Sequence, residues 1–189
     1  MSTLDKLNPD NVLIVLADLQ PPILAAANKT NPEANLKRAV SVLTEGAKVL
    51  DIPIFTSAVP LQPDTAPALI DELSSQTIVV RTTPGVFDDV ASQQTIANHK
   101  RSVIAIGGVA SELAVLQTAL GARRLGYDVY LLTDVSGGLS DRTEQAAFRQ
   151  LEAAGVTLSS VAGFLSSLIP PPEDPRGQSI FAALARFFG

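Results

Sequence analysis

The stretch "GGVASELAVLQTALGARRLGYDVYLLTD", residues 107–134, decides the fold class. The apolar run that leads into it, residues 102–108, predicts a buried strand that ends at a tight turn. Residues 111–125 then have helical spacing, and Gly126 is placed to be the C′ residue that ends the helix. A second apolar strand, residues 128–133, follows. Strand, helix and strand at these lengths predict a βαβ unit with parallel strands.

The same alternation extends through the rest of the chain. The unbroken apolar run from Val12 to Ala17 predicts a strand buried on both faces. Further strands are expected at 52–59, 77–81 and 156–160, with helices at 32–50, 65–75, 90–98 and 142–154. The sequence therefore predicts an α/β protein with three α/β/α layers and a mostly parallel six-stranded sheet, in one domain of residues 1–169.

The last twenty residues have a different character. "PPPEDPRG" predicts an extended linker within residues 170–189, because proline fixes φ and blocks a helix. The helix expected after it carries an apolar stripe of Ile180, Phe181, Leu184, Phe187 and Phe188. This helix either docks on its own domain or reaches a neighbouring subunit. Because charged residues make up only 17% of the chain, we expect a homo-oligomer, with this helix as a candidate contact.

Composition excludes several function classes. The net charge is −5 and Lys and Arg form no cluster, so nucleic acid is not an expected partner. The chain has no cysteine, which excludes disulfides, thiolate metal sites and cysteine catalysis. One histidine, His99, is expected to be a solvated surface residue, and no metal site or cofactor is expected. With no signal peptide and no membrane-spanning run, a cytoplasmic protein without a membrane partner is expected.

Polar residues that follow the predicted strands are the candidates for chemistry, because ligands of open parallel sheets bind at the carboxyl ends of strands. Asp18 is either a proton-transfer group or a carboxylate that caps the next turn. Arg81 is either an ion-pair partner of Asp18 or a fork for a substrate carboxylate. Ser111 and Glu112 open a helix whose first amides could hold an oxyanion.

Two more polar residues follow the strand at 128–133. Asp134 is expected to be structural and to accept from backbone amides of the Ser136–Gly137–Gly138 turn. Ser136 belongs to the same set of strand-end residues.

From Val12 to Ile169 the chain resembles the isochorismatase-like hydrolases, also called the cysteine hydrolase superfamily. The resemblance rests on "VLIVLADLQPPI", "TIVVRTTPGVF", the stretch at 107–138 and "TEQAAFRQLEAAGVTLSS", in that order. The segment "TDVSGG" and the helix after it are most similar to the YcaC-like branch. The resemblance implies an isochorismatase-like (Rossmann-like) fold and a small polar metabolite as substrate, hydrolysed at an amide C–N or vinyl-ether bond.

The resemblance also assigns site positions. The family triad is an Asp, a Lys and a Cys, and these positions fall on Asp18, Arg81 and Ala114. Substrate or oxyanion contacts are implied for Gln20, Phe87, Ala110 and Ser111, with a cis peptide at Ala110–Ser111. Two of the three triad positions therefore differ from the family pattern.

Three interpretations remain open. Alanine cannot attack a carbonyl, so thiol-dependent hydrolysis is not expected. Asp18 could instead protonate a vinyl ether, with Arg81 on a substrate carboxylate. Alternatively, the chain is a catalytically inactive homologue that binds a small molecule or serves as an oligomeric scaffold. In the third interpretation, Ala114 is an engineered replacement of an active cysteine.

Overall fold

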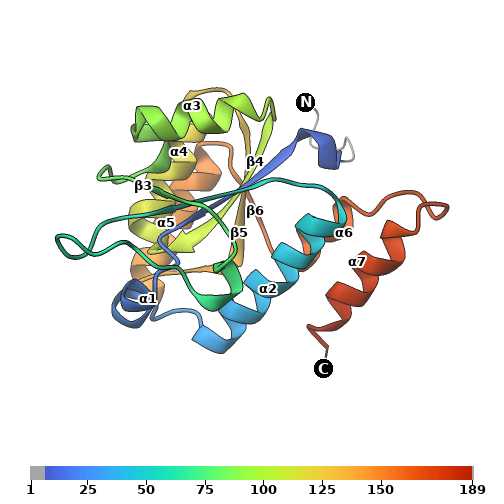
Figure 1. Cartoon of the computed structure of the whole chain (residues 1–189), viewed down its shortest axis with the longest axis horizontal. Helices are drawn as coiled ribbons and strands as arrows, with labels where there is room; N and C mark the ends of the chain where they lie inside the picture. The colour runs from blue at the N-terminus through green and yellow to red at the C-terminus, as the bar shows by residue number, and fades with distance from the viewer. Residues whose placement is uncertain (1–6, 189) are drawn as a thin grey trace.

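The computed structural model describes residues 7–188 and has one six-stranded sheet in which every strand pair is parallel (Figure 1). The strand order is β3-β2-β1-β4-β5-β6. The strands are β1 (Val12–Ala17), β2 (Ile54–Ala58), β3 (Ile78–Val80), β4 (Val103–Val109), β5 (Asp128–Gly137) and β6 (Thr157–Ser159). The predicted α/β fold is confirmed.

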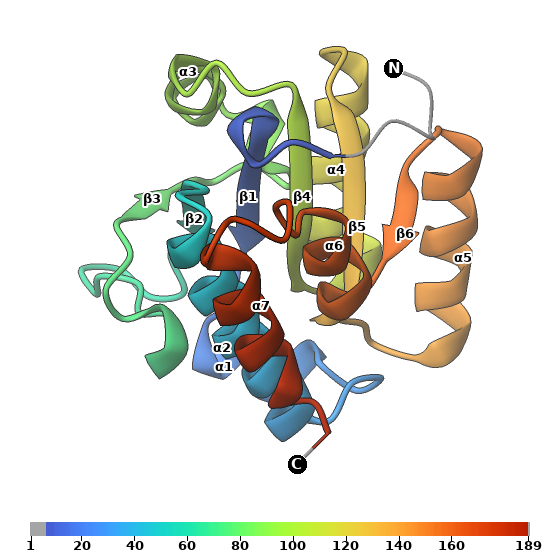
Figure 2. The ribbon, with the colours of Figure 1, turned by 90° about the vertical axis from the view of Figure 1, so that its right-hand side faces the viewer.

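Helices cover both faces of the sheet (Figure 2). The helices are α1 (Pro21–Ala27), α2 (Glu33–Val49), α3 (Val90–Asn98), α4 (Leu116–Arg124), α5 (Asp141–Ala153), α6 (Val161–Ser167) and α7 (Arg176–Ala185). Residues of α1, α2, α6 and α7 pack in one buried cluster, and residues of α3, α4 and α5 pack in the other. Alternate residues of β1 belong to the two clusters, as expected of a strand covered on both faces.

Glycines follow two of the predicted helices, and Gly126 takes the C′ position that the sequence predicted for it. Gly126 follows α4 with φ +87°, and Gly155 follows α5 with φ +79°. The left-handed region is nearly free of steric cost for glycine, which lets the chain turn directly from helix to strand.

The helix expected at residues 65–75 is wrong. Only a 3-10 turn, η2 (Asp71–Leu73), forms there, because Pro67 interrupts the helical pattern. The segment is instead held by its backbone and core side chains: the Ile70 amide donates to the Leu19 carbonyl, and both Ile70 and Leu73 are buried.

Two short helices, α1 and α6, were not predicted from the sequence. Helix α1 starts at Pro21 and Pro22, whose fixed φ suits a first helical turn. Helix α6 carries Gly163 near its middle, which weakens the helical signal, but the Ser160 hydroxyl caps the helix by accepting from the Gly163 amide.

The C-terminal helix α7 docks on its own chain, beside α2 (Figures 1 and 2). Ile180, Ala183 and Leu184 are buried against the core, and Phe187 packs partly against it. Phe181 and Phe188 point elsewhere and are 61% and 91% exposed. Three of the five residues of the predicted apolar stripe therefore pack within the chain, and the other two are exposed to solvent. Within residues 7–188, every helix falls short of the length and apolarity that crossing a bilayer requires.

Candidate functional site

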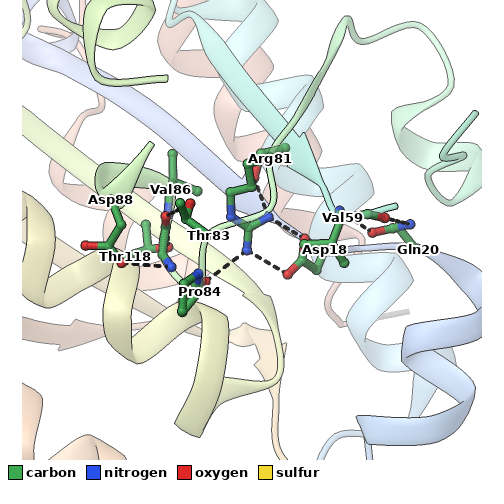
Figure 3. Close-up of polar contacts among 11 residues, drawn as sticks. Asp18, Gln20, Val59, Arg81, Thr83, Pro84, Val86, Asp88 and Thr118 are labelled. Atoms are coloured by element: carbon green, nitrogen blue, oxygen red, sulfur yellow. Dashed lines mark hydrogen bonds and ion pairs between the residues drawn. The ribbon is translucent and has the colours of Figure 1, made fainter. Parts of the chain in front are cut away.

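The carboxyl edge of the sheet carries a buried ion pair between the residues that follow β1 and β3. Arg81 Nη1 lies 2.7 Å from Asp18 Oδ1, and Nη2 lies 2.8 Å from Asp18 Oδ2 (Figure 3). Asp18 is 4% exposed and Arg81 is 2% exposed. Two parallel N–H···O bonds between a guanidinium and a carboxylate are the strongest geometry for such a pair. Of the two roles considered for Arg81, the structure has the ion pair.

Backbone geometry brings these side chains together. Asp18 has a left-handed conformation, φ +58°, which aspartate tolerates better than most residues. The Asp18 amide donates to the Ser57 carbonyl and the Arg81 amide donates to the Ala58 carbonyl, so both residues are still held by the β2 backbone. Neighbouring β4 comes very close to β1 here, since a Cβ on Gly108 (φ +144°) would overlap the Ala17 carbonyl oxygen.

The Arg81 guanidinium has two further partners. Nη1 donates to Ser57 Oγ at 3.2 Å, and Nη2 donates to the Pro84 carbonyl at 3.1 Å. Its Nε is buried and has no hydrogen-bond partner among the described residues. Both terminal nitrogens are thus fully engaged, which leaves them without a free donor for a substrate carboxylate.

Gln20 has a structural contact that the sequence did not reveal. Its Nε2 donates to the Val59 carbonyl at 3.1 Å, and its Oε1 accepts from the Val59 amide at 3.0 Å (Figure 3). The side chain amide thereby continues the pairing of β1 with β2 by one step beyond the strands. Gln20 is buried and fixes the loop after β2 rather than lining the cavity described below.

The turn between β4 and α4 differs in detail from the expectation. The cis peptide is Val109–Ala110, one residue before the predicted Ala110–Ser111 bond. The Ala110 carbonyl accepts from the amides of Leu113 and Val115, so the first helical turn starts at Ala110, directly after the cis bond. The expected helix at 111–125 opens as a π-helical turn, Ser111–Val115, before α4 begins.

The side chains of this turn are anchored to α5. The buried Ser111 hydroxyl donates to Glu144 Oε1 at 2.7 Å. Glu112 Oε1 accepts from the Leu139 amide at 2.9 Å and from the Thr143 hydroxyl. The start of α5 therefore fixes the position of the turn that carries Ala114.

A solvent-open cavity of about 500 Å³ joins Asp18, Arg81 and Ala114. The three positions that the resemblance assigns to the family triad come from three different segments and line one cavity. Its other walls are formed by Val59, Thr83, Pro84, Asp88, Glu112, Leu113 and Gln117. Of these, only Glu112 was considered from the sequence. Leu113 and Gln117 have the i, i+4 spacing that places side chains on one helix face, and this signal could have found them.

Several predicted residues lie outside the cavity. Phe87 is buried in the core and packs on Tyr127 with ring centroids 5.6 Å apart. Ala110 and Ser111 do not line the cavity with their side chains, and the oxyanion role of the amides around them stays a prediction. His99 is exposed at the end of α3, as expected. Within residues 7–188, no three His, Cys, Asp or Glu side chains are arranged to hold a metal ion.

Asp134 is structural, but its expected partners are wrong. Both carboxylate oxygens accept from the Val161 amide, at 2.9 and 3.1 Å, at the start of α6. The amides of Ser136–Gly138 do not donate to Asp134, because β5 continues to Gly137 and no turn forms where the strand was expected to end. Burial raises the pKa of Asp134, and the Val161 hydrogen bond opposes this only in part.

This pKa predicts a pH-dependent contribution to stability. A carboxyl with a raised pKa in the folded state stabilises the fold below its unfolded pKa, and this contribution is lost as the pH rises through the folded pKa. Asp134→Asn keeps an acceptor for the Val161 amide, so wild type should lose stability relative to this variant as the pH rises from the unfolded pKa of aspartate, about 4, through the raised folded pKa. Asp134→Ala removes the acceptor and should cost about 1 kcal/mol. Urea denaturation across this pH range measures both effects, and parallel curves for wild type and Asp134→Asn would contradict the assignment.

A family model of the isochorismatase domain matches residues 12–163. The chain belongs to the isochorismatase family. The match includes Asp18, Arg81 and Ala114 and confirms the predicted superfamily. Among curated proteins, a probable hydrolase, YcaC of Escherichia coli strain K12, is 27% identical over 171 residues, which cover 86% of this chain and 80% of that protein. This similarity agrees with the YcaC-like branch predicted from the sequence.

Solved structures of family members have the same fold. The YcaC gene product of Escherichia coli, described as an octameric hydrolase of unknown specificity, superposes with a TM-score of 0.84 at 22% identity, over 98% of this chain and 91% of that chain. YcaC from Pseudomonas aeruginosa, with hexane-2,5-diol and covalent acrylamide, superposes with a TM-score of 0.83 at 20% identity, over 98% of this chain and 93% of that chain.

Proposed function

We propose that this family member binds a small polar molecule in the cavity over Asp18, Arg81 and Ala114, and that it does not hydrolyse the molecule through a covalent intermediate. The observation that carries this proposal is the methyl group of Ala114 in the cavity wall, beside the Asp18–Arg81 ion pair. A thiol-dependent covalent mechanism needs a cysteine at this point, and the chain has none. The Thr83 hydroxyl, which also lines the cavity, donates to the Gly85 carbonyl and has no base beside it among its hydrogen-bond partners.

The ion pair also argues against Asp18 as an acid. Arginine keeps its proton in proteins, so both Asp18 oxygens accept from a permanently charged donor. An oxygen that accepts a guanidinium N–H is disfavoured as the carrier of a proton for transfer. Binding without covalent chemistry is therefore favoured over the vinyl-ether mechanism.

Hydrolysis without a nucleophile is the second candidate function. It is supported by one observation, namely that the Asp18 carboxylate lines the cavity and is within reach of a bound molecule. In that mechanism the protonated Asp18 carboxyl gives its proton to the enol-ether carbon, and water adds to the oxocarbenium ion and returns a proton to Asp18. The hemiketal then breaks its C–O bond to give a carbonyl compound and an alcohol. Isochorismate and other vinyl ethers are the substrates that test it.

The deciding experiment compares the wild-type chain with Ala114→Cys on a panel of small amides and on isochorismate. We expect no turnover by wild type and ammonia release by the variant. Loss of isochorismate with wild type would establish the second candidate instead, and ammonia release by wild type would overturn the proposal. Saturation-transfer NMR with the same amides should detect binding to wild type and none to Ala114→Leu, whose side chain occupies the cavity.

We further propose that the chain assembles into a homo-oligomer through α7. Phe181 and Phe188 are largely exposed on this helix, and exposed aromatic groups of this size are common at interfaces. The related Escherichia coli YcaC is described as octameric.

The double variant Phe181→Glu/Phe188→Glu should therefore lower the mass of the particle measured by light scattering, with the fold retained. Gln145→Glu, at an exposed position of α5, is the control for added charge and should leave the mass unchanged. An unchanged mass in the double variant would remove α7 from the interface.

A further inference from the structure

The cavity has an unbalanced set of charges. Among the described residues that line it, three are acidic, namely Asp18, Asp88 and Glu112, and one is basic, Arg81. A site built for a carboxylate ligand would have the opposite balance, because it needs a cation that is free to pair with the ligand.

Two of the three carboxylates are neutralised within the protein. Asp18 takes both terminal nitrogens of Arg81. Asp88 accepts from the Gly85 amide at 3.0 Å and lies 3.4 Å from Arg124 Nη2 on the surface side. The Arg81 guanidinium is thus already paired with Asp18, and Asp88 is paired with Arg124, which does not line the cavity.

Glu112 is the carboxylate that remains uncompensated. Its Oε1 has only neutral donors, the Leu139 amide and the Thr143 hydroxyl. Its Oε2 is buried and has no hydrogen-bond partner among the described residues. No Lys, Arg or His of residues 7–188 forms an ion pair with it. Glu112 and Ala114 both line the cavity, so a charge on Glu112 acts on a molecule that is bound there.

A second carboxylate, that of Glu144, lies close to Glu112 and adds to the negative charge in this region. The point where a Cβ on Gly138 would lie is 2.7 Å from Glu112 Oε2 and 3.3 Å from Glu144 Oε1, so the two carboxylates flank the same glycine. Glu144 is buried, accepts from the Ser111 hydroxyl and has no ion-pair partner in the described part of the chain. Glu144 does not line the cavity, but its carboxylate lies beside that of Glu112, and neither forms an ion pair in the described part of the chain.

We propose that the cavity selects a small molecule that carries a protonated amine or another cationic group, that it rejects carboxylates, and that Glu112 is the residue that sets this preference. The inference rests on the proposed function, since it names the class of ligand for the same site. An uncompensated charge at about 7 Å, with an effective dielectric constant of about 20–40, changes the local concentration of a unit charge by about tenfold. A cation is enriched and an anion is depleted by this factor, so the ratio of the two should change by about a hundredfold.

The test uses Ala114→Cys, whose thiol is the only one in the chain. The probes are 2-aminoethyl methanethiosulfonate, a cation, and 2-sulfonatoethyl methanethiosulfonate, an anion. Each reacts by attack of the thiolate on the thiosulfonate sulfur with loss of methanesulfinate, so the two rates compare access of opposite charges to one position. Ala146→Cys, exposed on α5, gives the ratio for a thiol in solvent. We expect the cation-to-anion rate ratio at residue 114 to exceed that at residue 146 by at least tenfold.

Variants of the Ala114→Cys chain assign the effect to its residue. Glu112→Gln keeps an acceptor for Leu139 and removes the charge, so it should lower the ratio by at least tenfold and by up to about a hundredfold. Glu152→Gln, the same change at an exposed position near the end of α5, should leave the ratio unchanged. A ratio at residue 114 equal to that at residue 146, or one that Glu112→Gln does not change, would overturn the inference. A thiol at 114 that reacts with neither probe would instead overturn the proposed function, because the cavity would then not admit small molecules.

Discussion

Replacement of Arg81 by methionine should cost the fold about 3–5 kcal/mol, because it leaves the buried Asp18 carboxylate without its partner. Methionine fills similar volume, so the loss reports the uncompensated charge rather than a cavity. The change is measured as the free energy of unfolding in urea, at a pH near 7 where the carboxylate is ionised in the unfolded chain.

Asp18→Asn in the Arg81→Met background tests the origin of that loss. It removes the stranded charge, so the double variant should be more stable than Arg81→Met alone. Arg81→Lys should fall between wild type and Arg81→Met, because a single ammonium cannot reproduce the two parallel bonds to Asp18 together with the bond to the Pro84 carbonyl. If Arg81→Met unfolds at the wild-type urea concentration, the ion pair does not stabilise this edge of the sheet.

The second large effect concerns catalysis. Adding Arg81→Lys to Ala114→Cys should raise ammonia release from small amides by about 10²–10⁴-fold over Ala114→Cys alone, the range that a positioned proton-transfer group contributes. A lysine can lose and regain a proton, whereas arginine stays charged. The pair would also restore the Asp, Lys and Cys that the family resemblance assigns to these three positions.

The effect should appear in turnover rather than in affinity for the amide, which separates proton transfer from binding. Arg81→Lys without the cysteine is the matched control and should remain inactive. Equal rates for Ala114→Cys with and without the Arg81→Lys change would mean that the residue at this position holds Asp18 and moves no proton.

The sequence predicted the sheet because its strands carry strong local signals. Val12–Ala17 and Val103–Val109 are unbroken apolar runs, and Gly126 and Gly155 mark the ends of the helices between strands. The helix at 65–75 failed for a reason visible in the sequence, since Pro67 lies inside it. The end of β5 at Gly137 had no such local mark, because Asn31, distant in sequence, satisfies the carbonyls of Asp134 and Ser136 there.

The candidate site likewise has residues that the sequence could identify and contacts that it could not. Asp18 and Arg81 could be named because each follows a strand, and strand ends share one edge. Ala114 was named only through the family resemblance, since an alanine carries no chemical signal of its own. The bidentate bond between Asp18 and Arg81 depends on side chains 63 residues apart, and periodicity cannot report such a contact. The contacts of Gln20 and Glu112 were harder still to predict. Their partners are the backbone atoms of Val59 and Leu139, and any residue type offers such atoms.

The place of β1 in the middle of the sheet has a consequence for how the chain is made. Its first partner, β2, follows at Ile54–Ala58, but its other partner, β4, pairs Val12 with Val103 and Ala17 with Gly108. Until Val109 has left the ribosome, the nascent chain carries an apolar strand with one open edge, which is a template for aggregation. Truncations that end before β4 should therefore be insoluble, and the speed at which β4 emerges sets how long that edge stays exposed.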